Sequence, residues 1–402
     1  MKILIINNNY QSTGGTETYI RLLIEILKKN NHDVYHFAID DNVEIFQPNL
    51  FVYRNRSRQR VLKHFLVYYF DPILYTRLRK WIKKINPDVI HVQNIGIFTI
   101  SILLAVRDCP KIVKTVHDIS ILCPSRAGYW GEGIECECGL GMKCGMRGCL
   151  SWFRLMYKTI PFYLSLLISQ RIIHSYIVAS TSLANKLRGF GYSPVFTVMH
   201  FVDLNVQPIE YPADDTQTIL FAGRVEKEKG VCVLLKAFQK VINRFPQSVL
   251  VIAGDGSYLK PIQSTIASEF SSSMRILGKI PPDELQLWYQ KAWLVAVPSI
   301  IFENTTMVIC EAMAAGRPIV GSRIGGIEHI TDQITGLLCE PGNSDDLAEK
   351  ICLILGNSNF GTMLGKNARK YAVNNFSSQK HYSQLMDIYL QPNGDILDNS
   401  LG

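Results

Sequence analysis

The sequence predicts an α/β protein with two Rossmann-like domains, each a doubly wound parallel sheet, that face a cleft. Its 402 residues are too many for a single hydrophobic core, because domains average about 150 residues. Hydrophobic residues make up 47% of the chain and charged residues 19%, which excludes a disordered or collagen-like protein. Short apolar runs also alternate with segments of helical periodicity along the whole chain, as β-α-β crossovers require.

The first half opens with a strand. Ile3–Asn7 begins as a continuous apolar run, which is typical of a strand covered on both faces of a parallel sheet. Gly14-Gly15 then precede apolar residues at helical spacing, up to a polar stop at Lys28-Lys29. Further strands are expected at Val34–Ile39, Val89–Gln93, Ile112–Thr115 and Ile177–Ala179.

The second half shows the same alternation more clearly. Strands are expected at Ile219–Ala222, Val249–Ala253, Met274–Leu277, Leu294–Val297 and Ile319–Ser322. Helices are expected near Val231–Arg244 and Tyr258–Phe270, after Pro281-Pro282, and around Met307–Ala315.

The domain boundary is expected where this pattern is interrupted. Residues 207–216 contain two prolines and no periodicity, so they are predicted to link an amino-terminal domain, residues 1–206, to a carboxy-terminal domain, residues 217–376. Residues 377–402 are predicted to form a terminal helix and a frayed polar tail.

Positive charge is concentrated in one stretch. Arg54–Lys84 contains ten basic residues and a single acidic one, Asp71. Aromatic and apolar residues interleave with them, which is the composition of a helix on an anionic membrane surface. The alternative is a pair of core-packed helices with solvated basic faces. The rest of the chain is close to neutral, so a nucleic-acid partner is not expected.

The chain is expected to be cytoplasmic and peripheral at the inner face of the cell membrane. No apolar run reaches the roughly 18 residues of a spanning helix. The segment Met1–Asn7 is too short for a signal peptide.

Two carboxylates eight residues apart mark a candidate ligand site. Glu303 follows the strand Leu294–Val297, and Glu311 lies further on, inside the expected helix. If that helix begins at Thr305 or Thr306, its free N–H groups can bind an anion or sugar hydroxyls. Glu311 can accept two hydrogen bonds from a vicinal diol such as ribose.

Together with three further matches in order, this run resembles the family 4 (group 1) glycosyltransferases, which are retaining and have the GT-B fold. The run Glu303 to Glu311 followed by Ala-Met-Ala-Ala-Gly corresponds to the family signature. The resemblance implies that Glu303 and the backbone of Asn304, Thr305 and Thr306 hold the transferred sugar, and that Glu311 holds the ribose.

The second match is the segment from Phe221 to Gly230. The resemblance implies that Arg224 and Lys229 neutralise the diphosphate of the leaving group, whose negative charge grows as the glycosidic bond breaks. Lys227, by contrast, is expected to be a solvated charge at a helix start.

The remaining matches are a histidine and several glycine loops. The resemblance implies that His117, after the strand Ile112–Thr115, holds the donor sugar through a hydrogen bond, while Asp118 orients the loop or the acceptor. The loop Gly14-Gly15 is expected near the phosphates. The nucleotide is expected to contact Gly254, Lys279 and Ile280.

The predicted function is therefore transfer of a sugar from a nucleotide sugar (UDP- or GDP-linked) to a glycan or lipid-linked acceptor. The amino-terminal domain is expected to bind the acceptor. Since two basic side chains supply the charge, no catalytic metal is expected. The alternatives are a GT-B epimerase or phosphorylase, or a catalytically degenerate interaction protein. Two departures from the family pattern are His200-Phe201-Val202-Asp203 in place of Asn-Gly-Val-Asp, and Asn304-Thr305-Thr306 after Glu303.

Five cysteines form a separate cluster: Cys123, Cys136, Cys138, Cys144 and Cys149. The segment between them is rich in glycine and has little apolar content for a core. In a cytoplasmic protein, thiolate–metal bonds are favoured over disulfides. A structural zinc or iron–sulfur centre, a redox-sensitive disulfide set and simple thiols all remain open, and the loop is expected to shape the acceptor site.

Overall fold

The computed structural model confirms the predicted fold class. It describes residues 1–8, 10, 14–41, 43–55, 69–96, 99–123, 129–130, 134–136, 139–204, 216–263, 272–327, 329–330 and 332–392. The chain divides into two compact units. The first comprises Met1–Arg126, Cys138–Val198 and Tyr382–Gly402, and the second comprises Ala127–Glu137 and Met199–His381.

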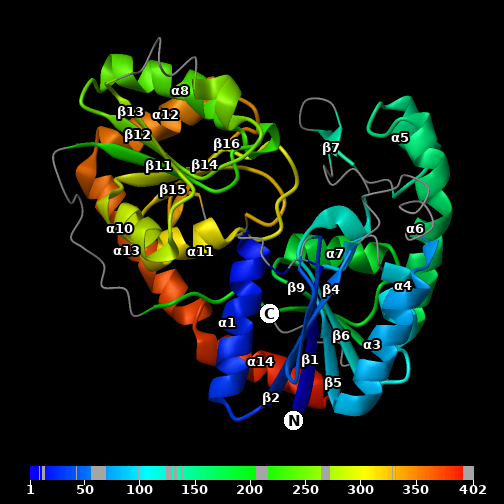
Figure 1. Cartoon of the computed structure of the whole chain (residues 1–402). Helices are drawn as coiled ribbons and strands as arrows, with labels where there is room; N and C mark the ends of the chain where they lie inside the picture. Colours follow the sequence, from blue (N-terminus) through cyan, green and yellow to red (C-terminus); the bar gives the residue numbers. More distant parts are fainter. Residues whose placement is uncertain are drawn as a thin grey trace. The chain divides into compact units, whose positions relative to one another are not determined.

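The first unit contains an eight-stranded sheet in the order β10-β9-β6-β5-β1-β2-β4-β3 (Figure 1). Its strands are parallel, except that β3 pairs antiparallel with β4. They are β1 (Lys2–Ile6), β2 (Asp33–Asp40), β3 (Ile45–Gln47), β4 (Leu50–Arg54), β5 (Val89–Val92), β6 (Lys111–Val116), β9 (Ser175–Val178) and β10 (Val195–Thr197). All the strands expected in this half are present, and β3, β4 and β10 are additional.

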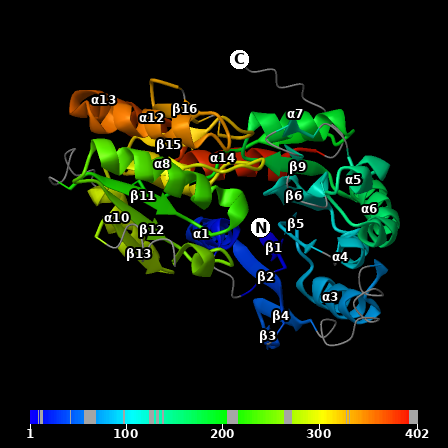
Figure 2. The ribbon, with the colours of Figure 1, turned by 90° about the horizontal axis from the view of Figure 1, so that it is seen from above.

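Helices of the first unit cover this sheet. They are α1 (Gly15–Lys29), α3 (Pro72–Ile85), α4 (Thr99–Val106), η3 (Ile119–Ile121), α5 (Met142–Met146), α6 (Trp152–Ile172) and α7 (Thr181–Gly189). Among them, α4 contacts both α3 and α6, and α5 contacts α6. Figure 2 shows α5 and α6 at the outer edge of this unit. The last helix, α14 (Ser378–Leu390), returns the chain to the first unit, where the Tyr389 hydroxyl lies 2.6 Å from His91 Nδ1.

The second unit contains a six-stranded, all-parallel sheet in the order β13-β12-β11-β14-β15-β16. Its strands are β11 (Thr218–Ala222), β12 (Val249–Ala253), β13 (Met274–Gly278), β14 (Leu294–Val297), β15 (Ile319–Ser322) and β16 (Gly336–Cys339). The five predicted strands of this half are confirmed, and β16 is additional. A separate two-stranded ribbon joins β7 (Tyr129–Trp130) to β8 (Ile134–Glu135).

The helices of the second unit lie on both faces of its sheet. They are η4 (Lys227–Lys229), α8 (Val231–Arg244), α10 (Pro282–Lys291), α11 (Met307–Ala314), α12 (Ser344–Leu355) and α13 (Ser358–Asn375). Figure 1 shows α8 and α12 on one face and α10, α11 and α13 on the other. The apolar sides of α8 and α12 close the core over the strands: Val231, Leu234, Phe238, Leu347, Ile351 and Ile354.

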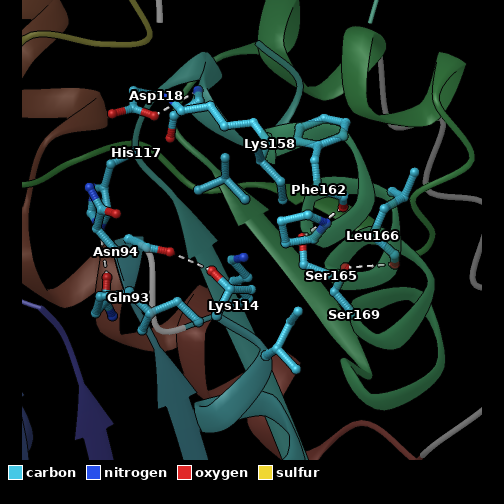
Figure 3. Close-up of a pocket in the computed structure, with 18 of the residues that line it drawn as sticks. Gln93, Asn94, Lys114, His117, Asp118, Lys158, Phe162, Ser165, Leu166 and Ser169 are labelled. Carbon is cyan, nitrogen blue, oxygen red and sulfur yellow. Dashed lines mark hydrogen bonds between the residues drawn. The ribbon is translucent and has the colours of Figure 1, made fainter. Parts of the chain in front are cut away.

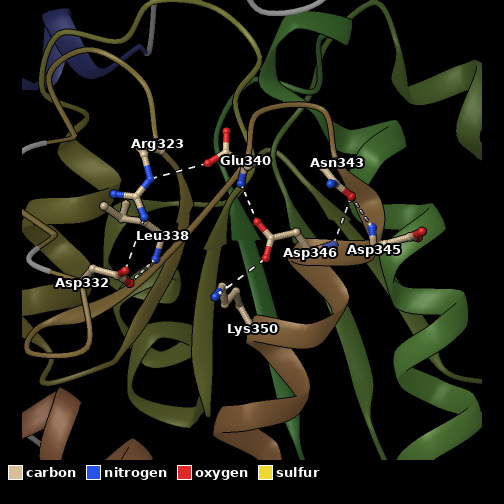
Figure 4. A network of polar contacts seen from close by, with 8 residues as sticks. All are labelled: Arg323, Asp332, Leu338, Glu340, Asn343, Asp345, Asp346 and Lys350. Carbon is tan, nitrogen blue, oxygen red and sulfur yellow. Dashed lines mark hydrogen bonds and ion pairs between the residues drawn. The ribbon is translucent and has the colours of Figure 1, made fainter.

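A polar network fixes the loops after β15 and β16 (Figure 4). Asn343 caps α12 by accepting from the N–H groups of Asp345 and Asp346 at 3.0 and 3.1 Å. The Asp346 carboxylate in turn accepts from the Glu340 N–H at 2.7 Å. Arg323 lies 3.3 Å from Asp332 and 3.7 Å from Glu340. These ion pairs are exposed, so the caps contribute more to the local order than the charges do.

Among the helices that the structure describes, none combines the length and the apolar composition that crossing a membrane requires.

Candidate active site

The second sheet reverses its strand order at β11 and β14. From β11 the chain leads outward through β12 to β13, and β14 then lies on the other side of β11. Ligands of open parallel sheets bind at the carboxyl ends of the strands beside such a reversal. The loops after the two strands meet here, because the Ile300 N–H donates to the Glu228 carbonyl at 2.9 Å.

Lys229 and Glu303 form an ion pair at this edge. Lys229 Nζ donates to Glu303 Oε1 at 2.5 Å, and the Ser299 hydroxyl donates to the same oxygen at 2.7 Å. The Glu303 side chain is only 9% exposed, and a buried carboxylate without partners is strongly destabilising. The two residues expected at the diphosphate and at the sugar are therefore neighbours. Ser299 was not among the predicted residues.

Arg224 lies on the same loop as Lys229 and is exposed. Its loop is held by the one that follows β12, because the Val225 N–H donates to the Asp255 carbonyl at 3.0 Å. The Glu226 carboxylate accepts hydrogen bonds from Ser257, and these bonds lower the pKa of Glu226. Two predicted loops, those of Arg224 and Gly254, thus form one rim.

Close packing inside this rim requires a glycine at position 254. Its φ is +151°, and a Cβ placed there would lie 1.8 Å from the Gly223 carbonyl oxygen. Its N–H donates to the Gly278 carbonyl at 2.8 Å, which connects the loops after β12 and β13. Lys279 and Ile280 follow directly, with Lys279 exposed and Ile280 half-buried. The loops predicted for the nucleotide therefore share one edge of the sheet.

The structure confirms that α11 begins where the sequence predicts. The Thr306 hydroxyl caps the helix by accepting from the Ile309 N–H at 3.4 Å. Thr305 is buried, and its hydroxyl lies 3.1 Å from His329 Nε2. Both hydroxyls therefore contact the protein itself, which leaves the backbone of these residues as the group available to a sugar. Asn304 is buried beside them.

Glu311 lies in the second turn of α11 in a poorly solvated position. The Tyr289 hydroxyl donates to Glu311 Oε2 at 2.8 Å. Burial raises the pKa of the Glu311 carboxyl to about 7, and the bond from Tyr289 partly offsets that rise. This carboxyl therefore titrates near neutral pH, where most carboxyls are fully ionised. Tyr289, on α10, was not predicted from the sequence.

His117 lies in the first unit, at the carboxyl end of β6. Its Nε2 is 2.7 Å from Gln93 Oε1, and the Tyr19 ring packs edge-on with centroids 5.4 Å apart. Burial lowers the pKa of His117 to about 4, so the imidazole is neutral at neutral pH. A neutral ring can hold a sugar hydroxyl but offers no positive charge. The contact of Gln93 with His117 was not predicted from the sequence. A polar residue at the end of a buried strand could have indicated it.

Gly14 and Gly15 begin α1, as the sequence predicts. The Gly14 N–H donates to Glu17 Oε2 at 3.1 Å, which satisfies one of the free N–H groups at the start of the helix. The carboxylate of Glu17 thus lies at the helix terminus where phosphates were expected. A negative charge at that position opposes a second anion.

A cavity of about 460 Å³ opens beside His117, between the carboxyl ends of β5 and β6 and the inner side of α6. Figure 3 shows Lys114 projecting from β6 and Phe162, Ser165 and Ser169 from α6. Three cationic residues and one acidic residue line this cavity: Lys114, Arg154, Lys158 and Asp118. Asp118 is already used as the cap of η3, where it accepts from the Ser120 N–H at 2.8 Å.

Lys114 is the buried cation of the cavity. It is 8% exposed, and within the described part of the chain its ammonium makes no hydrogen bond or ion pair. Burial lowers the pKa of Lys114 to about 8, against a smaller opposing effect of Asp118. The ammonium is therefore still mostly charged at neutral pH. A buried cation facing a cavity favours an anionic ligand there.

The cysteine cluster is only partly described, since Cys138 lies outside the described residues. Cys123, Cys136, Cys144 and Cys149 are half-buried and form no disulfide. The described residues contain no group of three or more ligands placed to hold a metal. A metal centre in this loop stays a prediction.

If the thiols of this loop hold a metal, the purified protein should contain near-stoichiometric zinc or iron, which elemental analysis measures. Metal-free protein whose loop resists proteases under reducing conditions would contradict the prediction.

Two family models match consecutive halves of the chain. "Glycosyltransferase Family 4" matches residues 13–206, and "Glycosyl transferases group 1" matches residues 206–371.

Curated relatives extend this likeness. An uncharacterised glycosyltransferase of Methanocaldococcus jannaschii is 31% identical over 182 residues, which cover 45% of this chain and 50% of the relative. The lipopolysaccharide 1,2-N-acetylglucosaminetransferase of Salmonella typhimurium is 36% identical over 35% of this chain and 39% of its own. The chain thus spans half or less of the length of these two relatives. The N-acetyl-alpha-D-glucosaminyl L-malate synthase of Bacillus anthracis is 24% identical over 97% of both chains.

Solved structures share the fold over nearly the full length. Sucrose-phosphate synthase from Thermosynechococcus elongatus superposes with a TM-score of 0.72 at 20% identity, over 96% of this chain and 98% of that one. Anabaena HepE in complex with UDP and glucose superposes with a TM-score of 0.72 at 19% identity, over 96% and 98% of the two chains.

Proposed function

The chain belongs to the glycosyl transferases of group 1, and from this premise we propose that it transfers a sugar from a nucleotide sugar to a glycan or lipid-linked acceptor. We propose that the anomeric configuration is retained. The observation that carries the proposal is the pairing of Lys229 with Glu303 at the strand reversal. It places the cation assigned to the diphosphate in direct contact with the carboxylate assigned to the sugar.

The donor is assigned to the second unit. Arg224 and Lys229 would bind the diphosphate, Glu311 the ribose, and the rim of Gly254, Lys279 and Ile280 the base. Glu303 and the backbone of residues 304–306 would then hold the sugar. The role that the resemblance implies for His117 stays a prediction. A diphosphate at Lys229 would share an ammonium that already holds Glu303 in place, so donor binding and sugar positioning would be coupled.

The acceptor is assigned to the cavity of the first unit. Its buried ammonium, Lys114, favours an acceptor that carries a phosphate or carboxylate near the hydroxyl to be glycosylated. The apolar part of the wall, including Phe162 and Leu166, suits the less polar part of such a molecule. This combination fits glycolipid or polysaccharide biosynthesis.

Arg224 and Lys229 would make a divalent cation unnecessary, since both would face the charge that develops on the leaving phosphate. Turnover should therefore persist when a chelator is present. Metal-dependent transferases use the cation for the same task.

The test begins with thermal shifts against UDP-, GDP- and ADP-sugars, because a ligand that binds the native state raises Tm. UDP sugars come first, since HepE was solved with UDP-glucose. The donor that binds is then incubated with phosphorylated and neutral acceptors, and the product anomer is determined by NMR. Transfer with retention supports the proposal. Epimerisation or phosphorolysis of the donor in the absence of an acceptor would favour the epimerase or phosphorylase alternative instead. If no nucleotide sugar raised Tm, the proposal would be contradicted.

We predict that donor affinity depends on pH through Glu311. Ribose hydroxyls donate to the ionised carboxylate, and the pKa of about 7 means that the free protein loses this form as the pH falls below neutrality. Affinity should therefore decrease on acidification, approaching tenfold per pH unit at low pH. Titration calorimetry measures this pH dependence of the affinity. An intact nucleotide sugar is used as the ligand because its diphosphate does not titrate near neutral pH.

Glu311→Gln is the control for this prediction. It keeps the side-chain shape but cannot ionise, so its donor affinity should be weak and independent of pH. Wild-type affinity that stays constant from about pH 8 to about pH 6 would show that Glu311 does not hold the ribose.

We also propose that the protein is cytoplasmic and binds an anionic membrane surface. The sequence assigns this contact to Arg54–Lys84, of which residues 56–68 lie outside the described residues. In the described part, Arg77 pairs with Glu44 and Arg79 with Asp108. The apolar residues Leu74, Leu78 and Trp81 of α3 are buried.

A further inference from the structure

The loop that follows β15 packs against the segment assigned to the transferred sugar. Its described residues are 323–327, 329 and 330, and we call them the β15 loop. We call residues 303–306 the sugar segment. The β15 loop contacts the sugar segment at two points. The Gly326 N–H donates to the Glu303 carbonyl at 2.6 Å, and His329 Nε2 lies 3.1 Å from the Thr305 hydroxyl oxygen.

The contact at Gly326 orients one peptide group of the sugar segment. In a trans peptide the C=O and the N–H that follows it point in opposite directions. The hydrogen bond from Gly326 to the Glu303 carbonyl therefore directs the Asn304 N–H away from the β15 loop. The approach is close, because Gly325 has a φ of +51° and a Cβ there would lie 2.6 Å from the same carbonyl oxygen. The first peptide of the sugar segment thus has a fixed orientation.

His329 fixes the other end of the sugar segment. The residue is 1% exposed and Thr305 is 7% exposed, and a buried hydroxyl without a hydrogen bond is costly. His329 Nδ1 lies 3.2 Å from the hydroxyl oxygen of Tyr371, on α13. A neutral imidazole has one donor and one acceptor nitrogen, so one ring can satisfy both hydroxyls. His329 therefore connects the sugar segment to α13.

Packing holds the His329 ring in place. The Phe376 ring packs edge-on with centroids 5.3 Å apart, and Phe376 is fully buried. The backbone is held as well, because the Thr335 hydroxyl donates to the His329 carbonyl at 3.0 Å. Thr305 directly precedes Thr306, the cap of α11. A ring fixed in this way therefore also fixes where the first turn of α11 begins.

We propose that His329 is a positioning residue of the sugar site. Through Thr305 it holds the backbone of residues 304–306 in the orientation that binds the transferred sugar. This inference rests on the proposed function, which assigns that backbone to the sugar. The nucleotide is assigned to other loops of the same sheet edge. Loss of the contact between His329 and Thr305 should therefore weaken binding of the sugar and leave binding of the nucleotide unchanged.

The test compares the dissociation constants of UDP-glucose and UDP by titration calorimetry. The GDP or ADP pair replaces them if the thermal-shift screen selects it. The ratio of Kd for the nucleotide sugar to Kd for the nucleotide isolates the contribution of the sugar. His329→Asn keeps an amide near the Nδ1 position and removes the group that faces Thr305. We expect it to raise this ratio about tenfold, because a hydrogen bond is lost on the sugar side only.

Two further variants address the same contact. His329→Gln places its amide near the Nε2 position, so the ratio should return to within about threefold of wild type. Thr305→Val removes the hydrogen bond from its other side and should raise the ratio as much as His329→Asn does. Combining Thr305→Val with His329→Asn should add nothing further, because both remove one interaction.

His381→Asn is the matched control. His381 is a second buried histidine of the second unit, 3% exposed, with its Nδ1 2.8 Å from the Met199 carbonyl oxygen. Its replacement disturbs the core to a similar extent but does not touch the sugar segment. The ratio should therefore stay within about twofold of wild type, even if Tm decreases.

Three results would overturn the inference. In the first, His329→Asn and Thr305→Val leave the ratio at its wild-type value. In the second, His329→Gln is as defective as His329→Asn, and in the third, His381→Asn raises the ratio equally. If His329→Asn does not fold, Thr305→Val and His329→Gln decide between the outcomes.

Failure of the proposed function would look different. The wild-type protein would then bind no nucleotide sugar or transfer no sugar. An unchanged ratio in the variants of a protein that does transfer sugar would overturn only the role of His329.

Discussion

Replacing Lys229 by alanine should lower kcat for sugar transfer by about 100-fold or more, because an electrostatic group aimed at developing charge is worth roughly 3 kcal/mol. Two effects act together. The leaving diphosphate loses a cation, and Glu303 loses the ammonium that lies 2.5 Å from its carboxylate. Steady-state kinetics with saturating donor measures the change.

The control lies two residues away. Lys227 is exposed on η4, so Lys227→Ala should change kcat by less than about twofold. Arg224→Ala should resemble Lys229→Ala in kcat but should leave the Glu303 contact intact. A loss of transfer in Lys227→Ala with full activity in Lys229→Ala would mean that the donor site is wrongly assigned.

Ser299→Ala separates the two effects of Lys229. It removes the 2.7 Å hydrogen bond to Glu303 and keeps the cation at the phosphate. We expect a smaller decrease in kcat, of about tenfold, since a hydrogen bond to a charged group contributes about 1.5–3 kcal/mol at most. An effect equal to that of Lys229→Ala would show that the lysine acts only through the carboxylate.

Gly230→Ala should strongly destabilise the candidate site. Gly230 has a φ of +73°, and a Cβ there would lie 1.8 Å from the Pro298 carbonyl oxygen. The side chain would force apart the loops after β11 and β14. We expect the free energy of unfolding to fall by more than about 3 kcal/mol, from left-handed strain together with the steric clash. Urea denaturation measures it, and residual activity should be low because Lys229 precedes this glycine.

Gly342→Ala is the matched control. Gly342 has nearly the same φ, +77°, but a Cβ there would meet nothing within 4 Å. Its replacement should therefore cost only the conformational strain, about 1–2 kcal/mol. If both substitutions destabilised the protein equally, the contact between the two loops would not contribute to the stability of the site.

The sequence was sufficient to predict most of the strands. Apolar runs such as Val249–Ala253, with Pro246 before it and Gly254 after it, are long enough and well enough bounded to be recognised without tertiary information. Short strands were missed where the pattern is weak: Gly336–Cys339 has four residues, and Leu50–Arg54 adjoins the basic stretch. Their pairing partners stabilise them, and partners are not visible in a local window.

The partners of the site residues could not be predicted either. Ser299, Tyr289 and Gln93 are polar residues of ordinary appearance in the sequence. Each acquires its role from a contact with a residue distant in the chain or from a loop conformation: Tyr289 with Glu311, Gln93 with His117 and Ser299 with Glu303. Hydrogen bonds of this kind depend on where the strands place their loops.

The net charge of the basic stretch shows most clearly what the sequence alone cannot predict. Counting along the chain gives Arg54–Lys84 a large positive charge, yet Glu44 and Asp108 from outside that stretch pair with two of its arginines. The exposure of the apolar residues of α6 is likewise decided by the tertiary structure: Ile160, Leu164 and Leu167 are 63%, 41% and 54% exposed.

The sequence by itself determined the two α/β units and the positions of their main strands along the chain, because these depend on local periodicity. The tertiary structure alone decided that Lys229 lies against Glu303, that Glu311 titrates near neutrality, that Lys114 faces a cavity and that α6 exposes an apolar stripe. Each of these properties is set by which groups exclude water from a given atom, and that depends on residues far away in the chain.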